Sequence, residues 1–270
     1  MTRFTVIIPA RYASTRFPGK PLVDIAGKTM IQRVYEQAKL SAVNRVIVAT
    51  DSELIFNHVV DFGGYAMMTS EHHQSGTERC GEVVTRLLQK NKIKPNDVVI
   101  NLQGDEPFLN PEQINSLMPY FTKYGRRIAT LVKSEKYDEV AHDPNVVKVV
   151  LDKQYRALYF SRAPIPYYRN AEESESALCW KHVGIYAYRV TTLLQLMELE
   201  PLPLEQAEML EQLRWMEHGF RIRTCPTEED NISIDTPEDL EKITPELIQN
   251  PINSVSLQCD KIDDNILLND

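Results

Sequence analysis

Near the start of the chain, residues 4–22 read FTVIIPARYASTRFPGKPL. The first residues of this stretch are apolar and mostly β-branched, a pattern that predicts a short buried strand. Three cations, Arg11, Arg16 and Lys20, follow in a loop that proline and glycine residues stiffen. Such a loop at the end of a strand can bind a polyphosphate, although it lacks the Walker pattern. A solvated basic loop is an equally good interpretation of three scattered cations.

Strand and helix patterns alternate through the first half of the chain. Apolar runs predict strands at 46–49, 65–68 and 98–102. Apolar residues at helical spacing predict helices at 31–38, 54–62, 83–88 and 114–121. This alternation predicts an α/β fold, with a mostly parallel sheet flanked by helices on both faces. Ligands bind such sheets beyond the carboxyl ends of the strands.

The second half of the chain is organised differently. Strands are expected at 146–151, 157–160, 183–188 and 221–224. A single helix is expected over 205–218, with Leu210 and Leu213 on one face. Thr236-Pro237 opens a last helix with an N-cap and a proline at the first helical position. The other segments are expected to be an acidic loop over 168–177 and a loosely held tail over 249–270.

Composition and charge exclude several classes of protein. A net charge of −8 makes broad nucleic-acid binding a poor expectation. Pro9 interrupts the first apolar run, and no run is long enough for a membrane helix, so neither a signal peptide nor a membrane span is expected. The four cysteines lie far apart in sequence and form no CxxC pair. A cytoplasmic, reducing compartment is therefore expected.

Two aspartates are candidate metal ligands. Asp105, in NLQGDEP, follows the strand predicted at 98–102, and Asp235, in SIDTPEDLE, precedes a helix start. If the last strand returns beside the first sheet, the two carboxylates face each other and suit magnesium on nucleotide phosphates. For Asp105 the alternative is a simple turn, because Gly-Asp-Glu-Pro is good turn chemistry.

The segment Gln74 to Arg79, QSGTER, has two interpretations as well. Ser75 and Glu78 fit a capping box, which is a purely structural role. Alternatively, Gly76 and Thr77 would let a flat base approach the start of the helix, and Arg79 would donate to a pyrimidine carbonyl.

Eight stretches, taken together and in order, resemble the 3-deoxy-manno-octulosonate cytidylyltransferases, the CMP-Kdo synthetase family. The resemblance covers about residues 3 to 243. The stretches are IIPARYASTRFPGKPLVDIAGK, HHQSGTER, NLQGDEP, PNVVKVVLD, ALYFSRAPIP, KHVGIYAY, EMLEQLR and SIDTPEDLE.

The resemblance implies a Rossmann-like nucleotidyltransferase fold with a smaller insertion, and a homodimer. The implied CTP-binding core comprises 1–130 and 220–248, and the implied sugar-binding and dimerisation subdomain comprises 131–219. The tail over 249–270 lies outside the resemblance. The implied reaction joins CTP and Kdo to give CMP-Kdo and diphosphate with Mg²⁺, for lipopolysaccharide synthesis.

The resemblance also implies a role for individual residues. The implied phosphate-binding residues are Arg11, Arg16 and Lys20, and the implied magnesium ligands are Asp105 and Asp235. The implied nucleoside pocket comprises Ser75, Gly76, Arg79 and Gln103. The implied sugar contacts are Arg162, His182, Tyr186, Glu211 and Gln212. Of the implied sugar contacts, Arg162 has the most specific role, because a guanidinium can bind the sugar carboxylate through two hydrogen bonds.

Three alternatives to this activity are kept. A related enzyme would use another acidic sugar, such as 8-amino-Kdo or sialic acid. A non-catalytic regulator would bind CTP without turnover, but binding alone does not need two metal carboxylates. A scaffold protein would leave the cationic loop unexplained.

Overall fold

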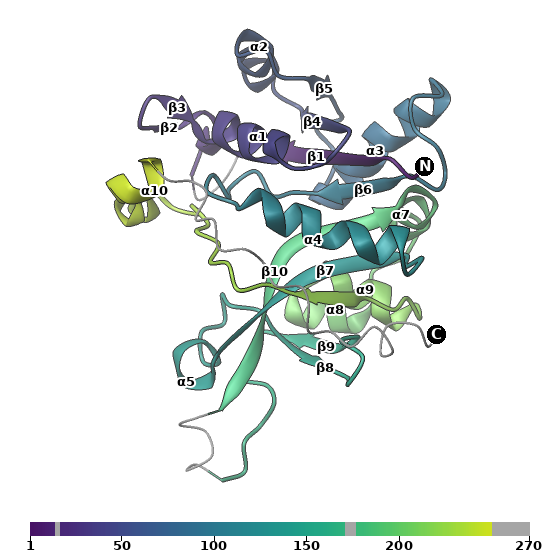
Figure 1. The fold of residues 1–270 in the computed structure, drawn as a ribbon, viewed down its shortest axis with the longest axis vertical. Coiled ribbons are helices and arrows are strands. Elements are labelled where there is room, and N and C mark those ends of the chain that lie inside the picture. The colour runs from purple at the N-terminus through teal and green to yellow at the C-terminus, as the bar shows by residue number, and fades with distance from the viewer. Residues whose placement is uncertain (14–16, 171–176, 250–270) are drawn as a thin grey trace.

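The computed structural model describes residues 1–13, 17–170 and 177–249 (Figure 1). Nine of the described strands form one sheet, in which the main path runs β11-β7-β10-β6-β1-β4-β5. The strands on this path are β1 (Phe4–Ala10), β4 (Arg45–Thr50), β5 (Ala66–Met68), β6 (Val98–Asn101), β7 (Ile128–Lys136), β10 (Leu178–Arg189) and β11 (Arg223–Pro226). The remaining strands are β8 (Lys148–Leu151) and β9 (Ala157–Ser161) in the same sheet, and the β2 (Asp24–Ile25) and β3 (Lys28–Thr29) pair.

Helices cover both faces of the sheet. The α-helices are α1 (Met30–Leu40), α2 (Glu53–Asp61), α3 (Gly76–Gln89), α4 (Pro111–Thr122), α5 (Tyr137–Val140), α7 (Val190–Met197), α8 (Pro203–Glu208), α9 (Glu211–Glu217) and α10 (Pro245–Gln249). The described residues also form two 3₁₀ turns, η1 (Lys20–Leu22) and η2 (Pro237–Lys242). Within the described residues, no helix has both the length and the apolar character needed to cross a membrane.

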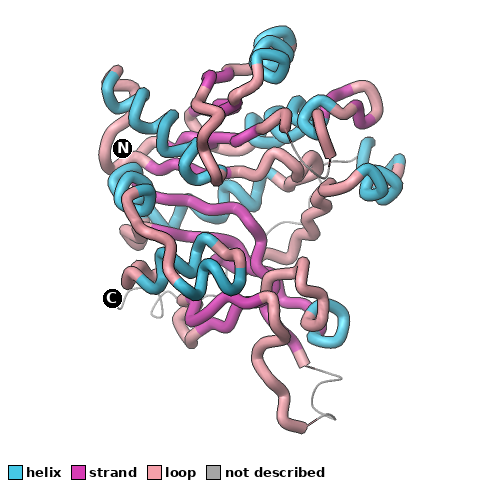
Figure 2. Tube along the Cα trace, turned by 180° about the vertical axis from the view of Figure 1, so that it is seen from behind, coloured by secondary structure: helices cyan, strands magenta, loops and turns pink. Residues whose placement is uncertain are grey.

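Strand β1 shows why the helices divide into two layers. Successive side chains of a strand point to opposite faces of the sheet. Val6 and Ile8 pack in the core shared with α1, α2 and α4, whereas Ile7 packs in the core shared with α3, α7 and α9. Helices α1 and α4 lie in front of the sheet in Figure 1, and Figure 2 shows the opposite layer. This arrangement confirms the expected α/β fold with a flanked sheet.

The sheet is parallel where the sequence alternates strand and helix, and antiparallel at β10. Strand β1 pairs in parallel with β4 and β6, and β7 pairs in parallel with β11. Strand β10 runs antiparallel between β6 and β7, and its far end also pairs with β8. The expected division at residue 131 falls inside β7, so β7 and β10 connect the central sheet with the β8–β9 hairpin.

Several expectations for the second half need correction. The single helix expected over 205–218 was wrong, because Met209, with φ of 52°, separates α8 from α9. The helix expected to open at Thr236-Pro237 is the 3₁₀ turn η2, whose N-cap Thr236 forms a capping box with Asp239, and the short helix α10 follows it. Strand β7 and helix α7 were not predicted. The acidic loop and the tail fall largely outside the described residues, at 171–176 and 250–270.

Candidate active site

The carboxyl ends of β1 and β6 bring the first motifs together. The two strands are parallel neighbours, so Arg11 after β1 and Asp105 after β6 leave the same edge of the sheet. Gly19, with φ of 71°, then turns the chain back, and its N–H donates to the Tyr12 carbonyl at 3.0 Å. This turn places Lys20 at the start of η1, beside the edge. Arg16 lies outside the described residues.

Lys20 lies between the two aspartates. Its ammonium Nζ is 2.9 Å from Asp105 Oδ2 and 3.1 Å from Asp235 Oδ1. The Lys20 side chain is only 13% exposed, against 26% for Asp105 and 42% for Asp235. The two carboxylates, from distant parts of the chain, therefore converge on the Lys20 ammonium. That they hold magnesium stays a prediction.

Backbone contacts fix this meeting of distant segments. The Ile234 N–H donates to the Asp105 carbonyl at 3.0 Å, and Ser233 Oγ donates to Asp235 Oδ2 at 3.1 Å. On the other side, a Cβ on Gly104 would lie 3.0 Å from the Pro9 carbonyl oxygen. Gly104 therefore lets the loop after β6 pass close to the end of β1. A cavity of about 150 Å³ lies here, lined in part by Arg11, Lys20, Gln103 and Asp105.

The start of α3 forms the next part of the site. Ser75 caps the helix, because its Oγ accepts the Glu78 N–H at 3.2 Å. The carboxylate of Glu211 accepts from Ser75 Oγ at 3.0 Å and from Thr77 Oγ1 at 2.6 Å. A Cβ on Gly76 would lie 3.0 Å from the Pro9 ring, so only a glycine fits easily against the end of β1. Ser75, Gly76 and Glu211 are thus brought together beside the Asp105 loop.

Arg79 points away from this group. The residue is fully buried, and its Nη2 is 2.6 Å from Asp51 Oδ2. Its Nη1 donates to Thr69 Oγ1 at 2.5 Å. These contacts fix the guanidinium beneath the start of α3, so a direct contact with a base stays a prediction.

His182 and Tyr186 lie on β10, on either side of a bulge. The register with β7 shifts between Val183 and Tyr186, and Thr130 Oγ1 donates to the Ile185 carbonyl at 2.8 Å within the bulge. His182 Nε2 lies 3.0 Å from the same hydroxyl of Thr130, and its ring is 5.2 Å from that of Tyr186. Thr130 therefore holds both the bulge and the imidazole in place.

Arg162 is bound to backbone carbonyls. Its Nε donates to the Glu208 carbonyl at 2.8 Å, and its Nη1 donates to the Pro144 carbonyl at 2.9 Å. Nη2 lies 3.4 Å from the Met209 carbonyl. The guanidinium thus holds the end of α8, and the contacts of the described residues do not bring it to Asp105 or Lys20. Gln212 is buried on α9, one residue after Glu211.

Comparisons with known proteins place this arrangement in a family. The family model described as "Cytidylyltransferase" matches residues 5–224. The chain belongs to the cytidylyltransferase family. Its relatives include the 3-deoxy-manno-octulosonate cytidylyltransferase of Parabacteroides distasonis, 49% identical over 90% of this chain and 97% of that protein. The enzyme of the same name from Porphyromonas gingivalis is also 49% identical, over 89% of this chain and 95% of that protein.

Solved structures agree with this assignment. A CMP:2-keto-3-deoxy-manno-octonic acid synthetase complexed with CTP is 45% identical, with a TM-score of 0.83 over 92% of this chain and 99% of that one. A 4-diphosphocytidyl-2C-methyl-D-erythritol synthase, 14% identical with a TM-score of 0.60 over 90% of this chain and 97% of that one, shares the fold. The chain is therefore a nucleotidyltransferase of the cytidylyltransferase family.

In this cytidylyltransferase, burial sets the charge of several groups. Burial lowers the pKa of His182 to about 3 and raises that of Tyr186 well above its usual value, so both side chains are neutral near pH 7. Burial and the Asp105 charge raise the pKa of Glu106 to about 7, and Asn231 donates to its carboxylate. Burial also raises the pKa of Glu211. The site thus contains neutral side chains on β10 and a buried acid behind the aspartates.

Sequence reasoning missed Thr130 and Gly104. The signal for Thr130 was present, because IATLV at 128–132 is an apolar, β-branched run of the kind that predicts a strand. The sequence indicates Gly104 only as part of a turn, because its close approach to Pro9 depends on a strand that is distant in sequence.

Proposed function

We propose that this chain transfers the cytidylyl group of CTP to Kdo and releases diphosphate. The observation that carries the proposal is the meeting of Asp105 and Asp235 on the Lys20 ammonium, in a chain 49% identical to the enzymes of that name. The anomeric hydroxyl of the sugar would attack the α-phosphorus of CTP and lose its proton. The bond from that phosphorus to the bridging oxygen would break, and diphosphate would leave.

The donor set fits magnesium. Carboxylate oxygens are the ligands that this hard cation takes in proteins, usually together with substrate phosphates. Asp105 and Asp235 already converge on a positive charge within 3.1 Å, which supports the proposal of a cation at this position. Asp105 and Asp235 would hold the ion, which when bound supplies positive charge against the phosphates.

The chain's own cations and helix start would bind CTP. Arg11, Arg16 and Lys20 would neutralise the phosphate oxygens, and Lys20 would stabilise charge on the leaving diphosphate. Ser75 and Gly76 at the start of α3, together with Gln103, would contact the nucleoside. Arg79 would act from beneath, since its partners are Asp51 and Thr69.

The sugar would bind along β10 and α9. His182 and Tyr186 are neutral, so they would exchange hydrogen bonds with sugar hydroxyls and not form ion pairs. Glu211 and Gln212 would reach the sugar from α9. Arg162 would bind the sugar carboxylate only by giving up a carbonyl partner, such as that of Pro144. The homodimer and the division at residues 131 and 219 are part of the same proposal.

The test measures diphosphate release from CTP in magnesium with Kdo, 8-amino-Kdo and sialic acid as separate sugars. We expect Kdo to support the fastest release. Asp105→Asn should lower turnover at least ~10²-fold, because charge stabilisation at the reacting phosphate is lost. Glu238→Gln, at an exposed acid in η2, is the matched control and should keep its activity. No release with any of the three sugars from a folded protein would refute the proposal.

A further inference from the structure

Lys148, the first residue of β8, is a fully buried cation to which the proposed reaction gives no role. Its ammonium Nζ donates to the backbone carbonyls of Asp143 at 2.8 Å, Val146 at 2.7 Å and Arg162 at 2.6 Å. An ammonium has three N–H groups, so the three carbonyls use all of them. A charged group is costly to bury, and burial lowers the pKa of Lys148. The fold therefore surrounds this charge with the acceptors that an ammonium needs.

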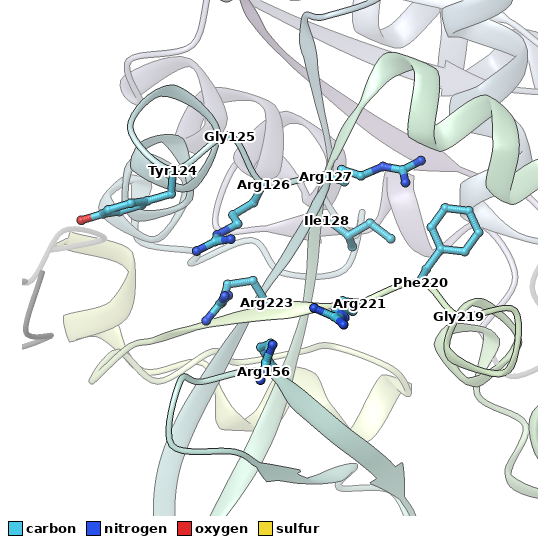
Figure 3. Close-up of a pocket in the computed structure, with 10 residues that line it drawn as sticks. All are labelled: Tyr124, Gly125, Arg126, Arg127, Ile128, Arg156, Gly219, Phe220, Arg221 and Arg223. Atoms are coloured by element: carbon cyan, nitrogen blue, oxygen red, sulfur yellow. The ribbon is translucent and has the colours of Figure 1, made fainter. Parts of the chain in front are cut away.

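Lys148 lies at the open end of the β8–β9 hairpin, where it is paired with Ser161 in the strand register. The closed end of the hairpin is held by another strand, because Arg156 in the turn forms an antiparallel bridge with Arg223 of β11. Figure 3 shows Arg156 and Arg223 where the turn meets β11, beside a cavity of about 500 Å³ that both residues line. At the open end, the ammonium connects the hairpin with the segment that precedes it.

That segment, residues 143–147, contacts two of the expected sugar ligands. The Pro144 carbonyl accepts from Arg162 Nη1 at 2.9 Å, and the Val147 carbonyl accepts from the His182 N–H at 2.8 Å. The ammonium holds two other carbonyls of the same segment and the carbonyl of Arg162 itself. One buried charge thus fixes the segment that lies between the two expected sugar ligands.

Glu208 holds the backbone of Arg162 from the other side. Its carboxylate accepts from the Arg162 N–H at 2.9 Å and from Ser161 Oγ at 2.6 Å. The N–H of Arg162 is therefore bound by an anion and its carbonyl by a cation. Hydrogen bonds to charged groups are stronger than those between neutral groups. The position of the Arg162 backbone is set by both charges together.

We propose that Lys148 is a positioning residue of the sugar site, which holds Arg162 and His182 in place for an acidic sugar. The proposal rests on the proposed function, because it takes these two residues as sugar ligands. Arg162 would reach the sugar carboxylate by giving up the Pro144 carbonyl. The ammonium would keep the segment and the Arg162 backbone fixed while that exchange takes place. The contacts of Lys148 do not include Lys20 or the start of α3, so CTP binding should not depend on it.

The first measurement is residue-resolved hydrogen exchange at the Arg162 and His182 amides in the full chain. Lys148→Met keeps most of the unbranched stem and removes the ammonium. We expect both amides to exchange at least ~10-fold faster in this variant than in the wild type. This measurement does not depend on the reaction. Unchanged exchange at both amides overturns the proposal.

The matched control is Val149→Ala, at the next residue of β8. The Val149 side chain is buried in the core shared with α3, α7 and α9, on the other face of the sheet from Lys148. The substitution loses buried contacts in the same strand and keeps the ammonium with its three carbonyls. An equal increase in exchange at Arg162 and His182 in this control would show that any damage to β8 has the same effect, and would overturn the proposal.

The second measurement is KM for Kdo and for CTP, from diphosphate release. Lys148→Met should raise KM for Kdo about tenfold and leave KM for CTP little changed, because only the sugar ligands lose their support. Equal rises for the two substrates would show a general loss of structure and overturn the proposal. If the wild type releases no diphosphate with any acidic sugar, the proposed function fails, and the exchange measurement alone decides whether Lys148 holds the two residues.

Lys148→Gln takes the place of Lys148→Met if the methionine variant does not fold. Its amide nitrogen can still donate to two carbonyls, but it carries no charge. The exchange rates and KM for Kdo should lie between those of the wild type and those expected for methionine. Wild-type values in both measurements would show that the ammonium is not needed, and would overturn the proposal.

Discussion

Replacing Lys20 by methionine tests whether the position between Asp105 and Asp235 is a cation site. Methionine keeps most of the unbranched stem and removes the ammonium, whose Nζ lies 2.9 and 3.1 Å from the two carboxylates. Without it, two negative groups face each other with no positive charge between them. We expect the free protein to lose stability, and magnesium to restore more stability to the variant than it adds to the wild type.

The magnitude follows from the geometry. Both carboxylate oxygens contact one nitrogen, so they lie within about 6 Å of each other, and two charges at that distance repel by about 3 kcal/mol at an effective dielectric constant near 20. The Asp235 side chain is 42% exposed. Solvent screening therefore reduces the expected loss in unfolding free energy to about 1–2 kcal/mol. Loss of a charge donor at the reacting phosphate should also lower turnover about 10²–10³-fold.

The assay is urea unfolding of both proteins in EDTA and in magnesium, together with diphosphate release. Lys28→Met is the control, because Lys28 forms a comparable pair with Glu36 at 2.6 Å on the surface, far from the two aspartates in sequence. The control should show no magnesium-dependent difference from the wild type. The reasoning fails if magnesium stabilises Lys20→Met and the wild type equally.

Three further predictions concern stability and sugar binding. The pKa of Glu106 is raised to about 7, so the folded state keeps a proton that the unfolded state loses near pH 4.5, and stability falls as pH rises between these values. Glu106→Gln should reduce the difference in unfolding free energy between pH 5 and pH 8 by up to about 3 kcal/mol, measured by urea unfolding with EDTA. An unchanged difference would contradict the argument that burial raises this pKa. Thr130→Val removes the hydroxyl that holds Ile185 and His182, so KM for the sugar should rise about tenfold; an equal rise for CTP would show general damage. Met209→Gly should stabilise the fold by about 1 kcal/mol, because φ is 52° at this residue and glycine adopts positive φ without strain. A lower unfolding midpoint would show that the contacts of the methionine side chain contribute more to stability than the backbone strain costs.

The first half of the fold was predictable because its strands are buried on both faces. The run from Val98 to Ile100 is continuously apolar and fully buried, which is the pattern of a strand between two helical layers. Because Asp105 follows this strand, the sequence also predicted that Asp105 lies beyond the carboxyl edge of the parallel sheet. That Asp235 lies beside Asp105 was predictable only on a condition about the path of the last strand. The sequence does not show that the Ile234 N–H donates to the Asp105 carbonyl, which is the contact that brings the two segments together.

The partners of the arginines were not predictable. Arg79 was assigned to a base from its place in the QSGTER segment and Arg162 to the sugar by resemblance, yet their guanidinium groups contact Asp51, Thr69 and backbone carbonyls. A pattern of residue types shows where a cation stands in the chain, but not which acceptor the fold brings to it. Backbone carbonyls in particular carry no sequence signal, since every residue has one.

The break at Met209 explains why one predicted helix had to become two. In a continuous helix, Glu208 and Glu211 are three residues apart and share a face. In the structure they serve different groups: Glu208 accepts from Ser161 Oγ at 2.6 Å and from the Arg162 N–H at 2.9 Å, whereas Glu211 accepts from Ser75 and Thr77 on α3.

A positive φ at one residue therefore turns two equivalent carboxylates toward two parts of the molecule. Glu208 holds the end of β9, next to the expected sugar ligand Arg162. Glu211 holds the start of α3, where the nucleoside is expected. The short segment from α8 to α9 thus connects the two proposed substrate sites through a pair of carboxylates. The positive φ at Met209, which helical periodicity does not predict, is what turns the two carboxylates toward these two sites.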